Sequence, residues 1–368
     1  MSFSPPPYPY ERLGGIKRLA GALEGGAIDC SIGTPIDPPP AMVLDELARG
    51  AGARGYPPSA GTEAFRTSAR DWLAERFGVE VEPNDLAACV GTKEFVASLA
   101  GYLHLRTPDR DTVLYPAISY PTYAMGATLA GLRAVPVAVR DGALDLASID
   151  AGDVDRALVL WSNSPSNPTG ALEDLEAVAA WGRRHGVLVA SDECYAAFTW
   201  SAEPASILRT GVAGVLALHS ASKRSNLAGL RAGFYAGDPD VVGYLRSVRQ
   251  HAGLMVPGPV QAAVAVAYRD ETHVVEQRAR YLERLTTLSA ALSTFGVQAP
   301  VPAGGFYLWC RQPGLDGWAL AERLASVSGI VSSPGELYGD AGAAYTRIAV
   351  VQPTERIELA AARLAKSN

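Results

Sequence analysis

Lysine, the side chain that supplies both an amine and a transferable proton, is scarce in this sequence. Only four of its 32 basic residues are lysines (Lys17, Lys93, Lys223 and Lys366), and the other 28 (32 − 4) are arginines. Lys17 falls in a predicted amphipathic helix and Lys366 lies close to the end of the sequence, so we expect both to be solvated. Lys93 and Lys223 lie in Gly- and Ser-rich junctions between predicted elements, where functional residues tend to gather. Amine chemistry in this chain therefore has two main candidates.

The segment around Lys223 has the composition of a phosphate site. Ser220 and Ser222 precede the lysine, and Arg231 follows it in the same Ser- and Gly-rich turn. Hydroxyls together with an arginine suit a phosphate dianion, which accepts several hydrogen bonds and favours a bidentate partner. Upstream, the run Gly-Thr-Lys-Glu at 91–94 opens a predicted helix. Free N–H groups at a helix start form an anion site and glycine permits close approach, so this run is a second, weaker candidate.

Two more polar segments follow predicted strands. The turn that contains Asn167 comes after the apolar run 157–161, and Asp192 and Tyr195 come after the run 187–191. Ligands bind beyond the carboxyl ends of parallel strands, so these side chains and Lys223 are expected to face one cleft. The alternatives are an ordinary connection for Asn167 and a helix-capping role for Asp192.

The elements that must position these residues follow an α/β rhythm. Residues 62–77 place Phe65, Ala69, Trp72 and Phe77 on one helical face. Short apolar runs then alternate with helical segments, at 112–115, 134–139, 157–161, 187–191, 215–219 and 232–236. Uninterrupted apolar runs of this kind indicate a mostly parallel sheet that is covered on both faces.

After about residue 238 the pattern changes. Helical stretches at 238–250 and 256–296 precede strand-like segments at 306–310 and 345–350, a helix near 316–327 and a final helix. We therefore predict an α/β protein with a large domain over 46–265. A smaller α+β domain is predicted to combine 1–45 with 266–368.

Composition excludes several classes of function. A net charge of −6 and a pI of about 5.5 argue against nucleic acid as a partner, although small anionic substrates need only a local cluster of cations. No apolar run is long enough to span a membrane, and the proline-rich start has no apolar signal core. The four cysteines form no CxxC pair, which is typical of reduced, buried thiols in a cytoplasmic protein. Dinucleotide, P-loop and zinc-protease motifs are absent from the sequence, and no metal site is expected.

Taken together, the motifs of this sequence resemble those of the class I/II aminotransferases, which have fold type I and depend on pyridoxal phosphate. The resemblance covers about Gly33 to Pro353. Its motifs are G-T-P at 33–35, Y-P-P-S-A-G at 56–61, G-T-K-E at 91–94, Y-P-T-Y at 120–123, N-P-T-G at 167–170, S-D-E-x-Y at 191–195, S-x-S-K at 220–223 with R-x-G at 231–233, G-F-Y at 305–307 and R-I-A at 347–349. The runs 91–94, 222–234 and 251–263 look most like the succinyldiaminopimelate aminotransferases of the shorter, actinobacterial type.

The resemblance implies a role for each of these residues. Lys223 is implied to bind the cofactor covalently and to move the proton, and Asp192 to pair with the pyridinium nitrogen. Tyr195 and Asn167 are implied to bind the phenolic oxygen, and Tyr120, with Tyr123 as the alternative, to stack on the ring. The residues implied to hold the phosphate or to line its site are Gly91, Thr92, Lys93, Ser220, Ser222, Arg231 and, from the neighbouring subunit, Tyr56. The residues implied to bind substrate are Gly33, Asn167 and, at the α-carboxylate, Arg347.

The resemblance also implies a homodimer with shared active sites and small amino-acid and 2-oxo-acid substrates. For the succinyldiaminopimelate group, the amino group passes between glutamate and N-succinyl-2-amino-6-oxopimelate in lysine biosynthesis. The far end of that substrate needs extra donors, for which Arg224 and Lys93 are candidates.

Three alternatives stay open at this point. The first is an aminotransferase for aspartate, alanine or aromatic amino acids, and the second is a pyridoxal-phosphate C–S lyase that shares every cofactor residue. The third is a non-catalytic binding module. Such modules usually carry an attached DNA-binding domain, for which the sequence before the first motif offers no segment.

Overall fold

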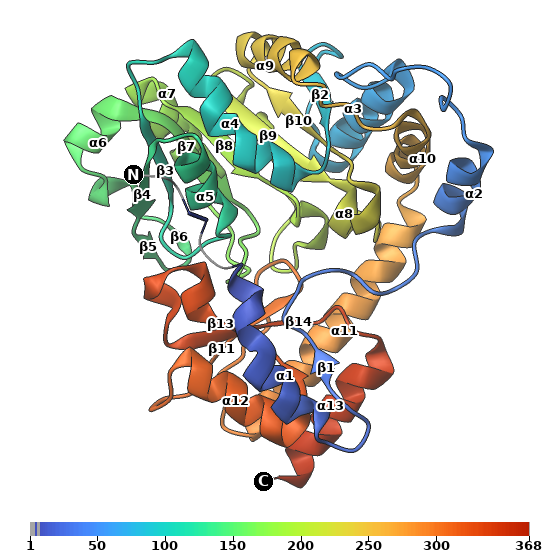
Figure 1. Ribbon diagram of the computed structural model, residues 1–368, viewed down its shortest axis with the longest axis vertical. Coiled ribbons are helices and arrows are strands. Elements are labelled where there is room, and N and C mark those ends of the chain that lie inside the picture. Colours follow the sequence, from blue (N-terminus) through green and yellow to red (C-terminus); the bar gives the residue numbers. More distant parts are fainter. Residues whose placement is uncertain (1–3, 6–7, 368) are drawn as a thin grey trace.

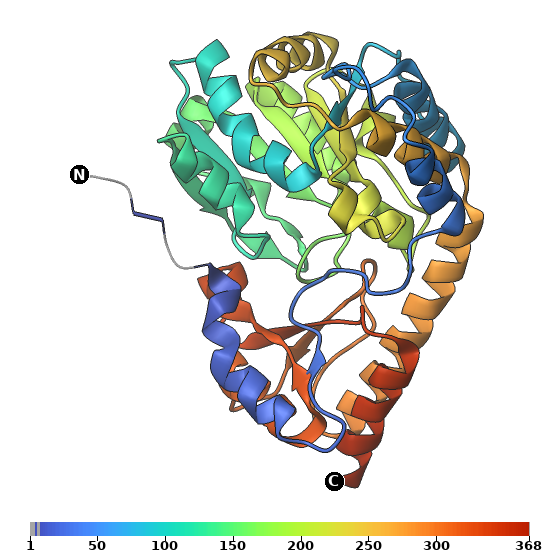
Figure 2. The ribbon, with the colours of Figure 1, turned by 45° about the vertical axis from the view of Figure 1, so that its right-hand side comes forward.

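The computed structural model describes residues 4–5 and 8–367, so the parts of the predicted smaller domain at 1–3, 6–7 and 368 lie outside the described residues. Two lobes are visible in Figure 1. The upper lobe surrounds a large sheet formed by the middle of the chain. The lower lobe combines the N-terminal helix with the C-terminal part of the chain, as Figure 2 shows from a second direction.

A seven-stranded sheet forms the upper lobe. Its order is β2-β10-β9-β8-β7-β3-β4, and every neighbouring pair is parallel except the two that involve β10, which is antiparallel to both β2 and β9. The strands are β2 (Leu86–Cys89), β3 (Thr112–Pro116), β4 (Arg133–Val137), β7 (Ala157–Asn163), β8 (Leu188–Asp192), β9 (Val215–Ser220) and β10 (Gly233–Gly237). The predicted mostly parallel sheet is confirmed. The sequence does not predict β2, because Leu-Ala-Ala-Cys contains no β-branched or aromatic residue.

Helices cover both faces of this sheet, which explains why its strands are apolar throughout. One face packs against α4 (Thr92–Arg106), α5 (Thr122–Leu129) and α9 (Pro239–His251), which contribute side chains such as Phe95, Tyr123 and Leu245. The other packs against α3 (Glu63–Phe77), α7 (Leu175–His185) and α10 (Gly258–Arg269). The lobe also contains α2 (Ala41–Arg49), β5 (Val139–Arg140), β6 (Ala143–Leu144), α6 (Ala151–Arg156) and α8 (Ala221–Arg224).

The lower lobe has its own small sheets and its own core. Strands β11, β14 and β13 form an antiparallel sheet, and β1 pairs in parallel with β12. The bounds are β1 (Ile28–Asp29), β11 (Tyr307–Arg311), β12 (Ile330–Val331), β13 (Ser333–Pro334), β14 (Tyr345–Ala349), α1 (Gly14–Gly21), α11 (Thr272–Thr294), α12 (Gly317–Ser328) and α13 (Thr354–Lys366). The α+β character predicted for this part is confirmed.

The single helical stretch predicted over 256–296 is two helices in the structure. Helix α10 ends at Arg269 and α11 begins at Thr272, so the chain turns at Asp270 and Glu271. Helix α10 packs against α2 and α3 in the upper lobe, whereas α11 packs against α13 in the lower lobe. The domain limits at 45/46 and 265/266 remain predictions.

Two negative findings concern the described part of the chain. None of its helices is long and apolar enough to span a bilayer. Residues 4–5 and 8–367 also contain no group of three or more His, Cys, Asp and Glu side chains placed to hold a metal ion. All four cysteines are buried and free.

Candidate active site

A pocket of about 410 Å³ lies between the lobes, where β7, β8 and β9 end and α4 begins. That volume is in the range of small-molecule sites. Most of the residues predicted from the sequence line it. They are Gly33, Thr92, Lys93, Tyr120, Asn167, Asp192, Tyr195, Ser220, Ser222, Lys223, Arg231 and Arg347.

Lys223 lies on the short helix α8, directly after β9. Its Nζ donates a hydrogen bond to the carbonyl oxygen of Gly33, on the segment that follows β1. Burial lowers the pKa of the Lys223 ammonium from its usual 10.5 to about 8. A lysine with a lowered pKa is a better nucleophile and base near neutral pH than a solvated one.

Asp192 ends β8 and is almost fully buried. Its Oδ2 accepts a hydrogen bond from the Tyr123 hydroxyl at 2.9 Å, and its Oδ1 accepts one from the backbone N–H of Cys194 at 3.2 Å. Burial raises the pKa of the Asp192 carboxyl, while the hydrogen bonds from Cys194 and Tyr123 act in the opposite direction. No cation of the described residues forms an ion pair with this carboxyl. A buried carboxylate without an ion-pair partner is a site for a ligand cation.

The contact between Tyr123 and Asp192 is not predicted from the sequence. The Tyr123 ring stacks on Trp161 with the centroids 5.0 Å apart, and it meets Tyr120 edge to face. The motif Y-P-T-Y contains both tyrosines, but only the packing of α5 against α4 and β3 shows which one reaches the carboxyl at the end of β8. Tyr120 lines the pocket and remains the candidate for stacking on a ring.

Arg347, on β14, occupies the lower side of the pocket and is 1% exposed. Its Nη1 donates to Asn167 Oδ1 at 2.7 Å, its Nη2 donates to the carbonyl oxygen of Ser31 at 2.6 Å, and its Nε has no partner among the described residues. The guanidinium is therefore fixed in place with a donor still free. Such a group can bind a carboxylate.

Gly33 lies where no larger residue fits. A Cβ at this position would come within 2.1 Å of Tyr307 Oη, which itself is 2.7 Å from Tyr195 Oη. The absence of a side chain brings the backbone of this segment against the two tyrosines, and its carbonyl reaches Lys223.

The upper end of the pocket is a candidate anion site. Gly91, with φ +76°, precedes α4, and a Cβ there would lie 2.2 Å from Arg231 Nη2. The hydroxyls of Thr92 and Ser220 line the same pocket, and Ser220 Oγ accepts the N–H of Ser222 at 3.1 Å. The 15-residue helix α4 directs its free N–H groups here, so donors, hydroxyls and a guanidinium converge as a phosphate requires.

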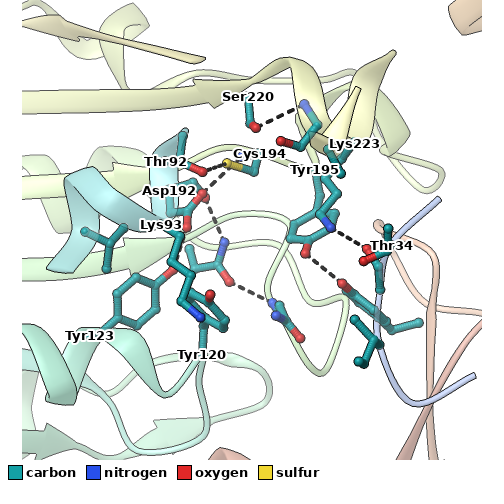
Figure 3. Close-up of a pocket in the computed structure, with 18 of the residues that line it drawn as sticks. Thr34, Thr92, Lys93, Tyr120, Tyr123, Asp192, Cys194, Tyr195, Ser220 and Lys223 are labelled. Carbon is teal, nitrogen blue, oxygen red and sulfur yellow. Dashed lines mark hydrogen bonds between the residues drawn. The ribbon is translucent and has the colours of Figure 1, made fainter. Parts of the chain in front are cut away.

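The side chains of three predicted residues lie away from the candidate anion site. Lys93 Nζ lies 3.2 Å from Tyr8 Oη and 4.9 Å from the centre of that ring, and in Figure 3 its side chain extends toward Tyr120 and away from Ser220. Tyr56 is 98% exposed and does not line the pocket of its own chain. Arg224 is buried outside the pocket, so it is not a donor for the far end of a substrate.

Comparisons with known proteins agree with this geometry. The family model described as "Aminotransferase class I and II" matches residues 28–364. The chain is 42% identical to 4-dedimethylamino-4-oxo-anhydrotetracycline transaminase of Streptomyces rimosus, over 98% of this chain and 99% of that one. It is also 42% identical to a probable aminotransferase of Mycobacterium tuberculosis, over 99% and 86%. Among solved structures, a probable N-succinyldiaminopimelate aminotransferase from Thermus thermophilus is 31% identical, with a TM-score of 0.88 over 98% of this chain and 100% of that one.

Proposed function

The chain belongs to the class I and II aminotransferases, which depend on pyridoxal phosphate, and we propose that it transfers an amino group between glutamate and N-succinyl-2-amino-6-oxopimelate. The single observation that supports a substrate with more than one carboxylate is that two of the cations lining the pocket, Lys93 and Arg347, have no role in the proposed cofactor site. Arg347 lies on the lower side of the pocket, and Lys93 lies at its mouth beside Tyr8. The likeness to the Thermus thermophilus protein supports the same substrate.

The residues of the pocket fit pyridoxal phosphate. When bound, the cofactor supplies an electron sink for the carbanion at the substrate Cα. We propose that Asp192 binds the pyridinium nitrogen, that Tyr195 and Asn167 bind the phenolic oxygen, and that Tyr120 stacks on the ring. The proposed phosphate ligands are the hydroxyls and guanidinium at the upper end of the pocket, together with the N–H groups at the start of α4. They come from Gly91, Thr92, Ser220, Ser222 and Arg231.

The proposed chemistry of the chain centres on one amine. Lys223 Nζ would hold the cofactor covalently, be released when substrate binds, and then take the proton from the substrate Cα. Arg347 would fix the α-carboxylate, and the carbonyl of Gly33 would keep the amine close to its target. With a 2-oxo acid bound, the same residues would deliver the proton in the reverse direction.

We also propose a homodimer. The ring of Tyr56 is exposed in the single chain and has no role in its own pocket. A second copy would place Tyr56 of one protomer near the phosphate held by the other, which completes both sites.

The lowered pKa of Lys223 predicts how cofactor capture depends on pH. Only the neutral amine attacks the cofactor aldehyde, so the rate should rise about tenfold per pH unit below pH 8 and level off above it. A lysine with an ordinary pKa would show a rate still rising at pH 10. Stopped-flow absorbance after mixing cofactor-free protein with pyridoxal phosphate measures this profile. A rate that keeps rising from pH 7 to pH 10 would contradict the assignment.

The direction of the Lys93 side chain predicts the effect of Lys93→Met. Loss of one charge-assisted contact should raise KM for the N-succinyl substrate about tenfold, with little change in KM for alanine or in cofactor affinity. Lys17→Met is the matched control, because Lys17 pairs with Asp29 on the surface of the other lobe. If cofactor affinity falls instead, Lys93 belongs to the phosphate group, as the family resemblance implies.

A half-reaction screen tests the proposed substrate. The holoenzyme is mixed with glutamate, succinyldiaminopimelate, aspartate, alanine and aromatic amino acids, and the loss of the visible cofactor band is followed. Succinyldiaminopimelate should react with the highest second-order rate constant after glutamate. Faster reaction with aspartate, alanine or an aromatic amino acid would contradict the proposed substrate, although the protein would still be an aminotransferase. Pyruvate release from cystathionine, without a response to glutamate, would indicate a C–S lyase.

A further inference from the structure

The short helix that carries Lys223 cannot hold its own position. Helix α8 has four residues, which is one turn, and an isolated turn is unstable in water. The side chains that follow the lysine therefore decide where the amine lies. All three of the next residues, Arg224, Ser225 and Asn226, turn away from the pocket and contact the junction of α10 and α11 or the start of α11.

Arg224 makes the largest of these contacts. It is 2% exposed, and its guanidinium donates to the carbonyl oxygens of Ala267 at 2.7 Å and Asp270 at 3.0 Å, and to the carboxylate of Glu271. The rings of Trp72 and Tyr268 lie 5.3 Å from the guanidinium, which leaves it little freedom. A cation at the C-terminal end of α10 is also stabilised by the helix dipole.

Ser225 and Asn226 extend the contact along α11. Ser225 Oγ lies 2.9 Å from His273 Nε2, and Asn226 Nδ2 donates to Gln277 Oε1 at 3.2 Å. Positions 273 and 277 are one turn apart on the same face of α11. Three consecutive residues beside the lysine are therefore attached to the start of α11 and to the junction that precedes it.

The same helix face also holds the segment on the other side of the pocket. Gln277 Nε2 donates to Asp37 Oδ2 at 2.8 Å, and Arg284 binds both oxygens of Asp37 at 2.7 and 2.8 Å. Asp37 belongs to the segment that begins at Gly33, whose carbonyl accepts the hydrogen bond of Lys223. Helix α11 thus connects the backbone of the lysine to the segment its amine contacts.

We propose that Arg224, Ser225 and Asn226 are positioning residues that make the placement of Lys223 depend on α11. Because α11 runs from the upper lobe into the lower one (Figure 1), movement of the lower lobe moves the lysine and the Gly33 segment together. This inference rests on the proposed role of Lys223 as the group that removes the substrate Cα proton. It predicts that loss of the contacts slows that proton transfer more than it weakens binding.

Kinetics with α-deuterated glutamate test this inference on the holoenzyme. Arg224→Met should lower kcat about tenfold, and Ser225→Ala and Asn226→Gly should each lower it about threefold. In all three the deuterium isotope effect on kcat should rise, while KM for glutamate and cofactor affinity change less than about twofold. Glycine suits position 226 because Asn226 has φ 55°. Arg224→Lys should restore part of the rate.

The matched control lies on the same helix. Ser289→Ala removes the hydrogen bond from Ser289 Oγ to the carbonyl oxygen of Ala299, which does not involve residues 224–226, and should leave kcat and the isotope effect unchanged. An unchanged isotope effect in Ser225→Ala and Asn226→Gly would overturn the inference, and these two variants decide it even if Arg224→Met fails to fold. Failure of the proposed role of Lys223 would appear separately, as turnover by Lys223→Ala.

Discussion

Lys223→Ala is expected to lower the rate of amino transfer from glutamate by on the order of 10⁴-fold, the upper range for loss of a positioned acid–base group. Among the described residues, Lys223 is the amine that lines the pocket and donates a hydrogen bond to the Gly33 carbonyl. The cofactor should still bind, because the phosphate donors at the start of α4 and at Arg231 remain. It should lose the visible band that comes from its covalent attachment.

Two comparisons make this result specific. Lys17→Ala removes an exposed lysine and should keep wild-type turnover and the wild-type absorption spectrum. Lys223→Arg keeps a positive charge that does not lose its proton near neutral pH, so it should be as inactive as the alanine variant. Turnover by Lys223→Ala within tenfold of wild type would show that another group moves the proton.

The second large effect is expected at Asp192. Asp192→Asn preserves the shape of the side chain but removes the buried charge proposed to pair with the pyridinium nitrogen. We expect the single-turnover rate with glutamate to fall about 10²–10³-fold, the range seen when one electrostatic contact to a transition state is lost. Folding should be unaffected, because burial already disfavours the charged form of this carboxyl, as its raised pKa shows.

A graded series separates the charge of Asp192 from its orientation. Tyr123→Phe removes the 2.9 Å hydrogen bond to Asp192 and leaves the carboxyl, so a smaller loss of about tenfold is expected. Tyr244→Phe is the matched control, because the Tyr244 hydroxyl donates to the carbonyl of Tyr102 in the same lobe and does not line the pocket. Equal rates for wild type and Asp192→Asn would mean that the cofactor nitrogen is not held by this residue.

The sequence predicts which residue types line this pocket better than it predicts which way their side chains point. Asp192 and Lys223 were foreseeable because each follows an apolar run, and the ends of neighbouring parallel strands meet at one edge. The hydrogen bond between Tyr123 and Asp192 was not foreseeable, because it depends on how α5 is rotated where it packs against α4 and β3. The burial of Arg224 was not foreseeable either, since adjacent residues on a helix point in different directions and the aromatic pair that encloses it comes from α3 and α10.

The break between α10 and α11 escaped prediction for a related reason. The residues at the turn, Asp270 and Glu271, include neither glycine nor proline, so the helical pattern continues across it. The turn is set by long-range contacts, among them Arg224 with the carbonyl of Asp270. Such contacts have no local signature in the sequence.

The reversed direction of β10 determines where the sequence can tolerate insertions and deletions. Ser220 and Gly233 lie opposite each other in the antiparallel pair, so the end of β9 and the start of β10 are adjacent. The lysine and the arginine of the anion site therefore share a single connection that is fixed at both ends. An insertion or deletion within 221–232 would shift both groups at once. The turn between β5 and β6, where Asp141 is exposed, can absorb added residues. We expect length variation among natural or engineered relatives to be excluded from the first segment and tolerated in the second.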